Sequence, residues 1–291
     1  MTPTRLGAVG YLNARPLVYG LDRSSRFTIR YDTPSECARV LHDGSIDVGL
    51  IPSIEYLRGG PYRIAPDLAI ASRGPVASVS LYATKAMADV RSIAVDTSSR
   101  TSVALVRVLY ARLFGIQPAI DARGPDLADM LAHSDAALII GDNALFLSHR
   151  QSDLRPEARG PRPEAGPRPA DLRPEPRGLR PEVEKIDLGE AWTTMTGLPF
   201  VYACWVGRPG ALDAAGVDRL QRARTAGLAN IDAIARDSFP ASRRQQAIGA
   251  AYLRDNIKYH LGDEERAGLE LFFRYAAEIG VVPTADALRF Y

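Results

Sequence analysis

Short apolar runs alternate with helical patterns along most of the chain, and a polar turn separates each run from the helix that follows. Residues 92–96 (SIAVD) predict a buried strand, residues 97–102 a polar loop, and residues 103–115 a helix that ends at a glycine. The same order recurs in three other stretches, namely 7–21, 46–56 and 136–145. Four such strand–turn–helix units predict an α/β architecture with mostly parallel sheets.

Capping signals mark further helices. The stretch 33–44 (TPSECARVLHDG) opens with a capping box and a proline at the first helical position, and it closes with a glycine. The C-terminal third is more helical, with helices expected at about 214–236, 241–260 and 263–280. The apolar stripe of the last helix is expected to pack in the core rather than to hold a cofactor.

The polar turns after the strands are the candidates for a binding site, because ligands of open α/β sheets bind beyond the carboxyl ends of the strands. These candidates are Asn13, Ser53, the loop 97–102, Gly141 and Asp142. Asn13 either caps a helix or points into a cleft and holds a ligand.

The loop 97–102 (TSSRTS) carries the strongest local signal. It places five hydroxyl side chains around Arg100 where a helix begins. Free backbone N–H groups, the helix dipole and the hydroxyl groups of Ser99, Thr101 and Ser102 would together suit a carboxylate or a phosphate. A helix N-cap with spare hydroxyl groups is the simpler alternative. A P-loop is excluded, because its glycines and lysine are missing.

Two stretches that each combine a turn with a strand are expected to connect two lobes. The first is 72–82, which contains Ser78, and the second is 196–207. The turn of the second stretch consists of Gly197, Leu198 and Pro199. If both strands cross between the lobes, Ser78 and this turn line the cleft.

A length of 291 residues favours two domains. We expect a discontinuous lobe 1, comprising 1–82 and 204–291, and a lobe 2 over 83–203. Lobe 2 contains a low-complexity segment, 152–184, in which Arg-Pro-Glu recurs four times. This segment has almost no large apolar residue, so it is expected to be a disordered surface loop; a proline-rich ligand for a partner protein is the alternative.

The composition is that of an ordinary globular protein, with 46% hydrophobic and 24% charged residues. A net charge of +2 gives no reason to expect a nucleic-acid or membrane partner. The two cysteines, Cys37 and Cys204, are too far apart to suggest a disulfide scaffold or a structural zinc site. An apolar span of about 20 residues and a signal peptide are both missing, so a cytoplasmic location is expected.

The common catalytic motifs are missing. The four histidines lack the spacing of metal ligands, and neither GxSxG nor GxGxxG occurs. We therefore expect neither a metal nor a cofactor. Glu55 and Asp142 lie in polar turns and could act as acids or bases, although helix capping and ion pairing fit them equally well.

Several stretches taken together resemble one family. They are GYLNARPLVYGL, DVGLIPSIEY, GPVASVSL, DTSSRTS, LIIGDNAL and WTTMTGLPFVYACW. In this order they resemble the chorismate dehydratases of the futalosine route to menaquinone (the MqnA type). The resemblance covers nearly the whole chain except 152–184. The sister dihydroxynaphthoate synthases share the fold, but YLNARPL and GPVAS look more like the dehydratases.

The resemblance implies a type II periplasmic-binding-protein fold, with two α/β lobes, mixed sheets, helices on both faces and two crossing strands as the hinge. It also implies that water is removed from chorismate, a small-molecule substrate, to give 3-[(1-carboxyvinyl)oxy]benzoate. Asn13 and Ser78 match motif positions that face the substrate, and we assign them to orienting the enolpyruvyl ether and the departing hydroxyl group. Ser99, Thr101 and Ser102 are expected to hold one carboxylate.

Several points stay open at this stage. The enolpyruvyl carboxylate of the substrate is the favoured proton acceptor, with Glu55 and Asp142 as alternatives. Arg100 belongs to the matching motif, but a salt bridge outside the cleft would fit it too, and the role of Arg15 is undecided. A non-catalytic binding protein or a sensor for a small carboxylate is the alternative function. The oligomeric state is open, a dimer included.

Overall fold

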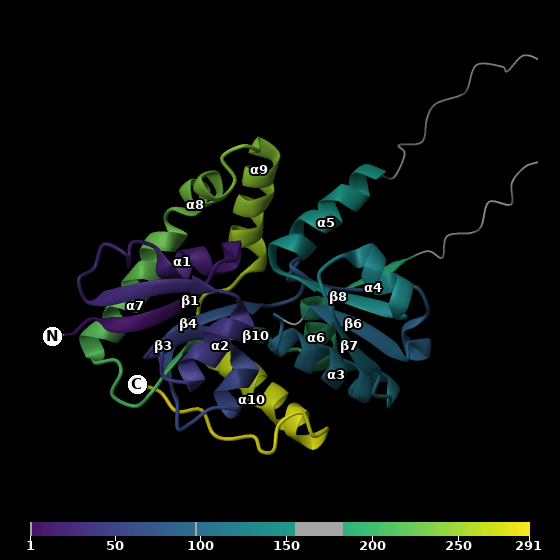
Figure 1. Ribbon diagram of the computed structural model, residues 1–291, viewed down its shortest axis with the longest axis horizontal. Coiled ribbons are helices and arrows are strands. Elements are labelled where there is room, and N and C mark those ends of the chain that lie inside the picture. Colours follow the sequence, from purple (N-terminus) through teal and green to yellow (C-terminus); the bar gives the residue numbers. More distant parts are fainter. Residues whose placement is uncertain (1, 97, 155–182) are drawn as a thin grey trace, which may run out of the picture.

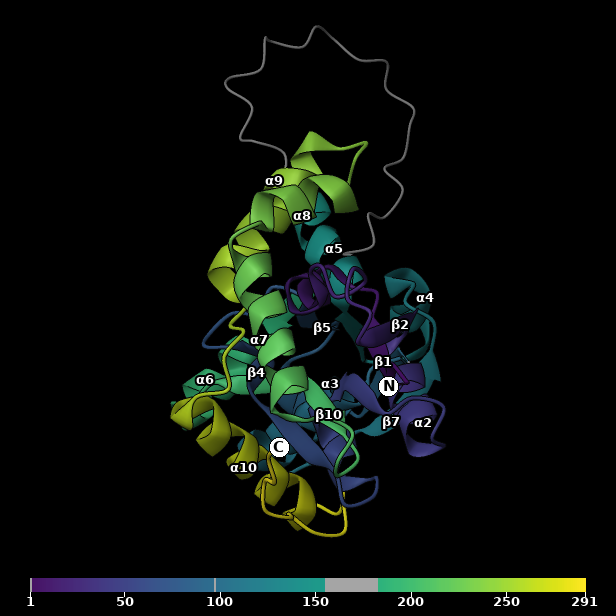
Figure 2. The ribbon, with the colours of Figure 1, turned by 90° about the vertical axis from the view of Figure 1, so that its left-hand side faces the viewer.

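The computed structural model describes residues 2–96, 98–154 and 183–291. Two lobes, each built on a five-stranded sheet, lie side by side (Figure 1). Both ends of the chain lie on lobe 1 (Figures 1 and 2). Most of the segment expected to be disordered, residues 155–182, lies outside the described residues.

The sheet of lobe 1 has the strand order β2-β1-β3-β10-β4. Its strands are β1 (Thr4–Val9), β2 (Phe27–Asp32), β3 (Val48–Pro52), β4 (Arg63–Ser72) and β10 (Phe200–Gly207). Strand β1 is parallel to β2 and β3, whereas β10 is antiparallel to β3 and β4. The sheet is therefore mixed.

The sheet of lobe 2 has the order β7-β6-β8-β5-β9. Its strands are β5 (Val79–Ala83), β6 (Ser92–Asp96), β7 (Ala119–Arg123), β8 (Ala136–Ile140) and β9 (Glu184–Asp187). Here β6 is parallel to β7 and β8, and β5 is antiparallel to β8 and β9. Each lobe thus combines parallel strands with one antiparallel strand, β10 in lobe 1 and β5 in lobe 2, and both sheets are mixed as predicted.

Helices flank both sheets. Lobe 1 carries α1 (Arg15–Val18), α2 (Pro34–His42), α7 (Ala214–Leu228), α8 (Ile231–Ser238), α9 (Arg243–Ala251) and α10 (Asp263–Glu278). Lobe 2 carries α3 (Thr101–Phe114), α4 (Leu127–His133), α5 (Gly141–Leu154) and α6 (Leu188–Thr196). Short 3-10 turns follow β1, β3 and β5, namely η1 (Leu12–Ala14), η2 (Ser53–Leu57) and η3 (Met87–Asp89). Among the described residues, no helix is both long and apolar enough to cross a membrane.

Two of the predicted helices are shorter than expected. The helix predicted at 214–236 is divided into α7 and α8, because the Asn230 side-chain amide donates to the Ala226 carbonyl (2.8 Å) and ends the first helix there. The helix predicted at 241–260 ends at Ala251 and continues as a π turn, Tyr252–Asn256. The last helix is confirmed, and its apolar stripe is buried in the core as expected.

The chain passes between the lobes in two short connections. Strand β5 belongs wholly to the sheet of lobe 2 and β10 wholly to that of lobe 1, so the connections are residues 73–78 and 197–199. The boundaries expected after residues 82 and 203 fall within β5 and β10, a few residues beyond these connections. Trp192 of α6 joins the lobes beside the second connection, since its ring packs edge-on against Phe200 and Phe272.

Asp187, at the end of β9, holds the first connection in place. Its carboxylate accepts hydrogen bonds from the backbone N–H groups of Val76 (3.0 Å) and Ala77 (2.7 Å). The same carboxylate caps α6 by accepting from Gly189 and Glu190. Ala77 has a φ of 63°, a left-handed conformation that costs a non-glycine residue roughly 1–3 kcal/mol and persists only where neighbours enforce it.

Replacing Asp187 by alanine should destabilise the protein strongly, because four backbone N–H groups lose a charged acceptor. We expect Asp187→Ala to lower the free energy of unfolding by about 3 kcal/mol, measured by urea denaturation. Asp126→Ala is the matched control, since Asp126 caps α4 alone and its loss should cost about 1 kcal/mol. Equal losses in the two variants would show that Asp187 is only a helix cap.

Candidate functional site

A cleft of about 580 Å³ lies between the two lobes. Both lobes contribute to its walls. Lobe 1 provides Val9, Tyr11, Asn13, Pro34, Pro52, Ile70, Tyr202 and Ala203. Lobe 2 and the first connection provide Val76, Ser78, Val79, Ser99, Arg100, Thr101, Ser102, Ile140 and Gly141.

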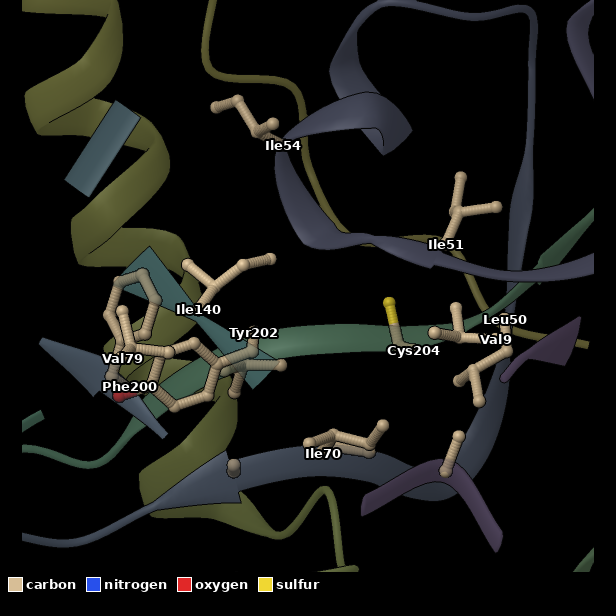
Figure 3. Close-up of a cluster of buried hydrophobic side chains, with 14 of the residues drawn as sticks. Val9, Leu50, Ile51, Ile54, Ile70, Val79, Ile140, Phe200, Tyr202 and Cys204 are labelled. Carbon is tan, nitrogen blue, oxygen red and sulfur yellow. The ribbon is translucent and has the colours of Figure 1, made fainter. Parts of the chain in front are cut away.

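Part of the cleft wall is apolar. Val9, Ile70, Val79, Ile140 and Tyr202 belong to one cluster of buried side chains that is drawn from strands of both lobes (Figure 3). An apolar wall of this kind suits the body of a small ring, while the polar groups around it fix the orientation of the ring.

The loop before α3 forms a polar wall. Ser99, Arg100, Thr101 and Ser102 all line the cleft, as predicted, whereas Thr97 lies outside the described residues. Helix α3 begins at Thr101, and Arg100 at its N-cap position makes no capping hydrogen bond with its side chain. The first-turn N–H groups of such a helix and the positive end of its dipole attract an anion.

Thr101 differs from the other members of this loop. Its hydroxyl oxygen accepts a hydrogen bond from the Ile54 N–H group (3.3 Å) and lies 3.4 Å from the Ser53 hydroxyl oxygen. Ser53 in turn donates to the Val201 carbonyl (2.8 Å). Thr101 therefore connects the lobes, and the hydroxyl groups of Ser99 and Ser102 are better placed to serve a ligand.

Asn13 and Ser78 both lie near Tyr252, a residue that the sequence pattern did not reveal. Tyr252, at the start of the π turn, donates its hydroxyl hydrogen to the Ser78 hydroxyl oxygen (2.7 Å). The Asn13 side chain lies near the Tyr252 hydroxyl group and acts to lower the pKa of this tyrosine. Burial raises the pKa of Tyr252 well above its ordinary value, so this tyrosine stays neutral.

Gly141 lies on the cleft wall and Asp142 lies just behind it. The Gly141 N–H group donates to the Ser78 carbonyl (2.8 Å), and its φ of 63° favours glycine. The Tyr11 ring is so close that a Cβ atom on Gly141 would meet it at 3.1 Å. Asp142 accepts from the Leu12 N–H group (3.2 Å), and burial raises the pKa of its carboxyl group.

Glu55, the other candidate base, also lies off the cleft wall. Its carboxylate is buried and is bound by His42 (3.0 Å) and Arg58 (2.8 Å). Burial alone would raise the pKa of Glu55, but these two hydrogen bonds outweigh it and lower the pKa below the ordinary value. Such a carboxylate is a weak base that serves the packing of lobe 1.

The turn at the second connection, residues 197–199, was predicted to line the cleft. In the structure it stabilises the fold instead. Gly197 ends α6 with a left-handed φ of 74°, and the Pro199 carbonyl accepts from the Trp192 indole N–H group (3.1 Å). Neither these two residues nor Leu198 is part of the cleft wall. Arg15 is not part of it either, and its guanidinium lies over the ring of Tyr31.

The cleft is built for binding and hydrogen bonding rather than for strong acid–base chemistry. Its described wall offers hydroxyl and amide groups and one arginine, but no carboxylate or imidazole. Three tyrosines at or behind the wall, Tyr11, Tyr202 and Tyr252, were not anticipated. Tyr11 could have been found from the sequence, because it lies in the same polar turn as Asn13.

Comparison with known proteins adds to this geometry. A family model described as menaquinone biosynthesis matches residues 4–160 and 169–278. The chain belongs to this menaquinone biosynthesis family. One curated relative, the chorismate dehydratase of Thermus thermophilus, is 32% identical over 281 residues, which cover 94% of each chain.

Solved structures show how this menaquinone biosynthesis protein is folded. A protein of Archaeoglobus fulgidus has a TM-score of 0.68 at 15% identity, with 97% of this chain and 99% of that chain covered. The periplasmic aliphatic sulphonate binding protein SsuA of Escherichia coli has a TM-score of 0.61 at 15% identity, with 98% and 95% covered. These likenesses confirm the predicted periplasmic-binding-protein-like fold.

The two buried carboxyl groups should give opposite pH effects on stability. The Asp142 pKa is raised in the folded state, so ionising it costs stability as the pH rises, and Asp142→Asn avoids this cost while keeping an acceptor for Leu12. The Glu55 pKa is lowered, so its ionised form adds stability at higher pH that Glu55→Gln loses.

Urea denaturation at several pH values measures both effects. Between about pH 4 and about pH 7, the difference in unfolding free energy should move in favour of Asp142→Asn and against Glu55→Gln, relative to the unsubstituted protein. A change of the same sign in both variants would contradict the assignment of the two environments.

Proposed function

We propose that the protein is a chorismate dehydratase, which removes water from chorismate to give 3-[(1-carboxyvinyl)oxy]benzoate. In this reaction one ring C–H bond and the adjacent C–O bond break, and the ring becomes aromatic. The proton passes to an acceptor and the hydroxyl group departs with the C–O bond electrons, and together they amount to one molecule of water. The relative of 32% identity over nearly the full length carries the proposal, and the chemistry of the cleft supports it.

The cleft fits the parts of chorismate. The apolar wall can hold the ring, and the loop before α3 offers Ser99, Ser102 and Arg100 to one carboxylate. Arg100 is exposed at the cleft, and its charge reaches the buried Glu55 carboxylate, whose pKa it helps to lower. A cation and a helix N-terminus on one wall suit a substrate that carries two negative charges.

Asn13 and Ser78 lie on another part of the wall and are assigned to the reacting atoms. A side-chain amide cannot remove a proton, so Asn13 orients the enolpyruvyl ether, while Ser78 donates to the departing hydroxyl group. Charge develops on that oxygen as the C–O bond breaks, and a fixed donor lowers the barrier there.

The enolpyruvyl carboxylate of the substrate is the assigned proton acceptor. Of the alternatives, Glu55 is bound by His42 and Arg58 and Asp142 lies behind Gly141, and neither is part of the cleft wall. Holding the substrate in a conformation that brings its own carboxylate to the ring proton replaces a protein base by orientation. Gly197, Leu198 and Pro199 have no place in this scheme, because they lie away from the cleft.

Asn13→Ala should lower kcat by at least about 100-fold, the usual loss when one oriented polar group is removed from a reacting centre. The assay is purified protein with chorismate, with the aromatic product followed by absorbance and chromatography. Asn143→Ala is the matched control, because Asn143 is exposed on α5 outside the cleft and its loss should leave kcat unchanged.

Three results would contradict the proposal. Full activity of Asn13→Ala would remove Asn13 from the reaction. Binding of chorismate without product would favour a binding protein or a sensor. Formation of dihydroxynaphthoate from its own precursor, with chorismate left intact, would favour the sister synthase.

Arg100→Gln should raise KM for chorismate by about tenfold and change kcat little, because one charge-assisted hydrogen bond to a carboxylate contributes roughly 1.5 kcal/mol. Arg107→Gln is the control, since Arg107 lies on the same helix away from the cleft. Equal KM values for the two variants would place the substrate carboxylate elsewhere.

A further inference from the structure

We propose that Tyr252 is a positioning residue, whose hydroxyl group fixes Ser78 as a hydrogen-bond donor to the departing hydroxyl group of the substrate. The inference rests on the proposed function, because it concerns the same reaction. Tyr252 acts on the substrate only through Ser78 and is not itself part of the described cleft wall.

The direction of the hydrogen bond between Tyr252 and Ser78 determines where the Ser78 hydrogen can point. Tyr252 donates its only hydroxyl hydrogen to the Ser78 oxygen (2.7 Å). Once the Ser78 oxygen accepts this bond, its own hydrogen must point elsewhere. Ser78 lines the cleft, so a substrate oxygen is the partner that this hydrogen can meet.

The fold holds Tyr252 firmly. Tyr252 opens a π turn that is closed by a hydrogen bond from the Ile257 N–H group to the Tyr252 carbonyl (3.3 Å). Beyond the turn, Lys258 and Ala71 exchange two backbone hydrogen bonds (2.8 and 2.9 Å). The Asn256 amide also donates to the Pro75 carbonyl (3.0 Å) on the first connection. Single π turns inside helices are frequent at functional sites.

The fold holds Ser78 equally firmly from the other side. Asp187 binds the N–H groups of the two residues before it, and Gly141 donates to its carbonyl. With both backbones fixed, rotation of the Ser78 hydroxyl group is the remaining freedom, and the Tyr252 bond removes it. Chains of hydrogen bonds also strengthen one another in a buried site, so the Ser78 hydroxyl becomes a better donor.

Burial keeps this arrangement unchanged over the working pH range. Tyr252 is buried, and burial raises its pKa, so it stays protonated and keeps donating. Asp142 and Asp187 are the charged groups whose fields reach Tyr252, and both act in the same direction as burial.

Tyr252→Phe tests the inference, because it removes one oxygen atom and keeps the ring. We expect kcat for chorismate to fall by about 10- to 100-fold, less than the loss of a direct donor, with KM changed by less than about threefold. Tyr259→Phe is the matched control. Both tyrosines are 2% exposed, but the Tyr259 hydroxyl has no hydrogen-bond partner among the described residues, so its loss should leave kcat unchanged.

A double-mutant cycle separates positioning from a merely structural role. If Tyr252 acts through Ser78, then Tyr252→Phe should cost little further activity, less than about threefold, in a Ser78→Ala protein. Losses that multiply in the double variant would overturn the inference. Near-UV circular dichroism and thermal unfolding of each variant show that the fold is retained.

The same experiment distinguishes this inference from the proposed function. If the unsubstituted protein makes no product from chorismate, the proposed function fails and this inference fails with it. If the unsubstituted protein is active and Tyr252→Phe matches it in kcat, only the role of Tyr252 is overturned.

Discussion

The hydrogen bonds of the Asp187 carboxylate are the constraint on which the cleft depends. They cap the N-terminus of α6 and fix the first connection between the lobes. Because of them Ala77 stays in a left-handed conformation that an alanine rarely adopts, and the next residue is Ser78. One half-buried acceptor at the end of β9 thereby fixes both the direction of the Ser78 side chain and the connection between the two lobes.

Closure of the cleft depends on weaker contacts. The Tyr11 hydroxyl lies 3.4 Å from the Ser98 hydroxyl, Leu12 donates to Asp142, and Ile54 donates to Thr101. At one end of the molecule (Figure 2), Phe146 of α5 and Phe239, which follows α8, meet edge to face with ring centres 4.9 Å apart. Each of these contacts contributes about 1–2 kcal/mol, so closure is the sum of several small contributions.

The sequence pattern was sufficient to predict the fold and part of the cleft wall. Polar residues that follow a strand, such as Asn13 and Ser99, reach the cleft because parallel strands end at one edge of a sheet. Tyr252 could not be found in this way, since it lies in a helical stretch and approaches Ser78 only after the chain has folded back along β4. The turn at Pro199 was misplaced because its carbonyl serves the Trp192 indole, a contact that no local pattern reveals.

A fold that many binding proteins share can serve an elimination if the substrate brings its own base. The loop before α3 and the N-terminus of this helix form a polar wall of the cleft that suits an anion. In addition to binding, turnover requires a hydrogen-bond donor that points at the departing oxygen. The hydrogen bond from Tyr252 to Ser78 has the required direction, because it leaves the Ser78 hydrogen to point into the cleft. A carboxylate on the cleft wall would repel both charges of chorismate, so the lack of one among the described wall residues favours catalysis by orientation rather than by a protein base.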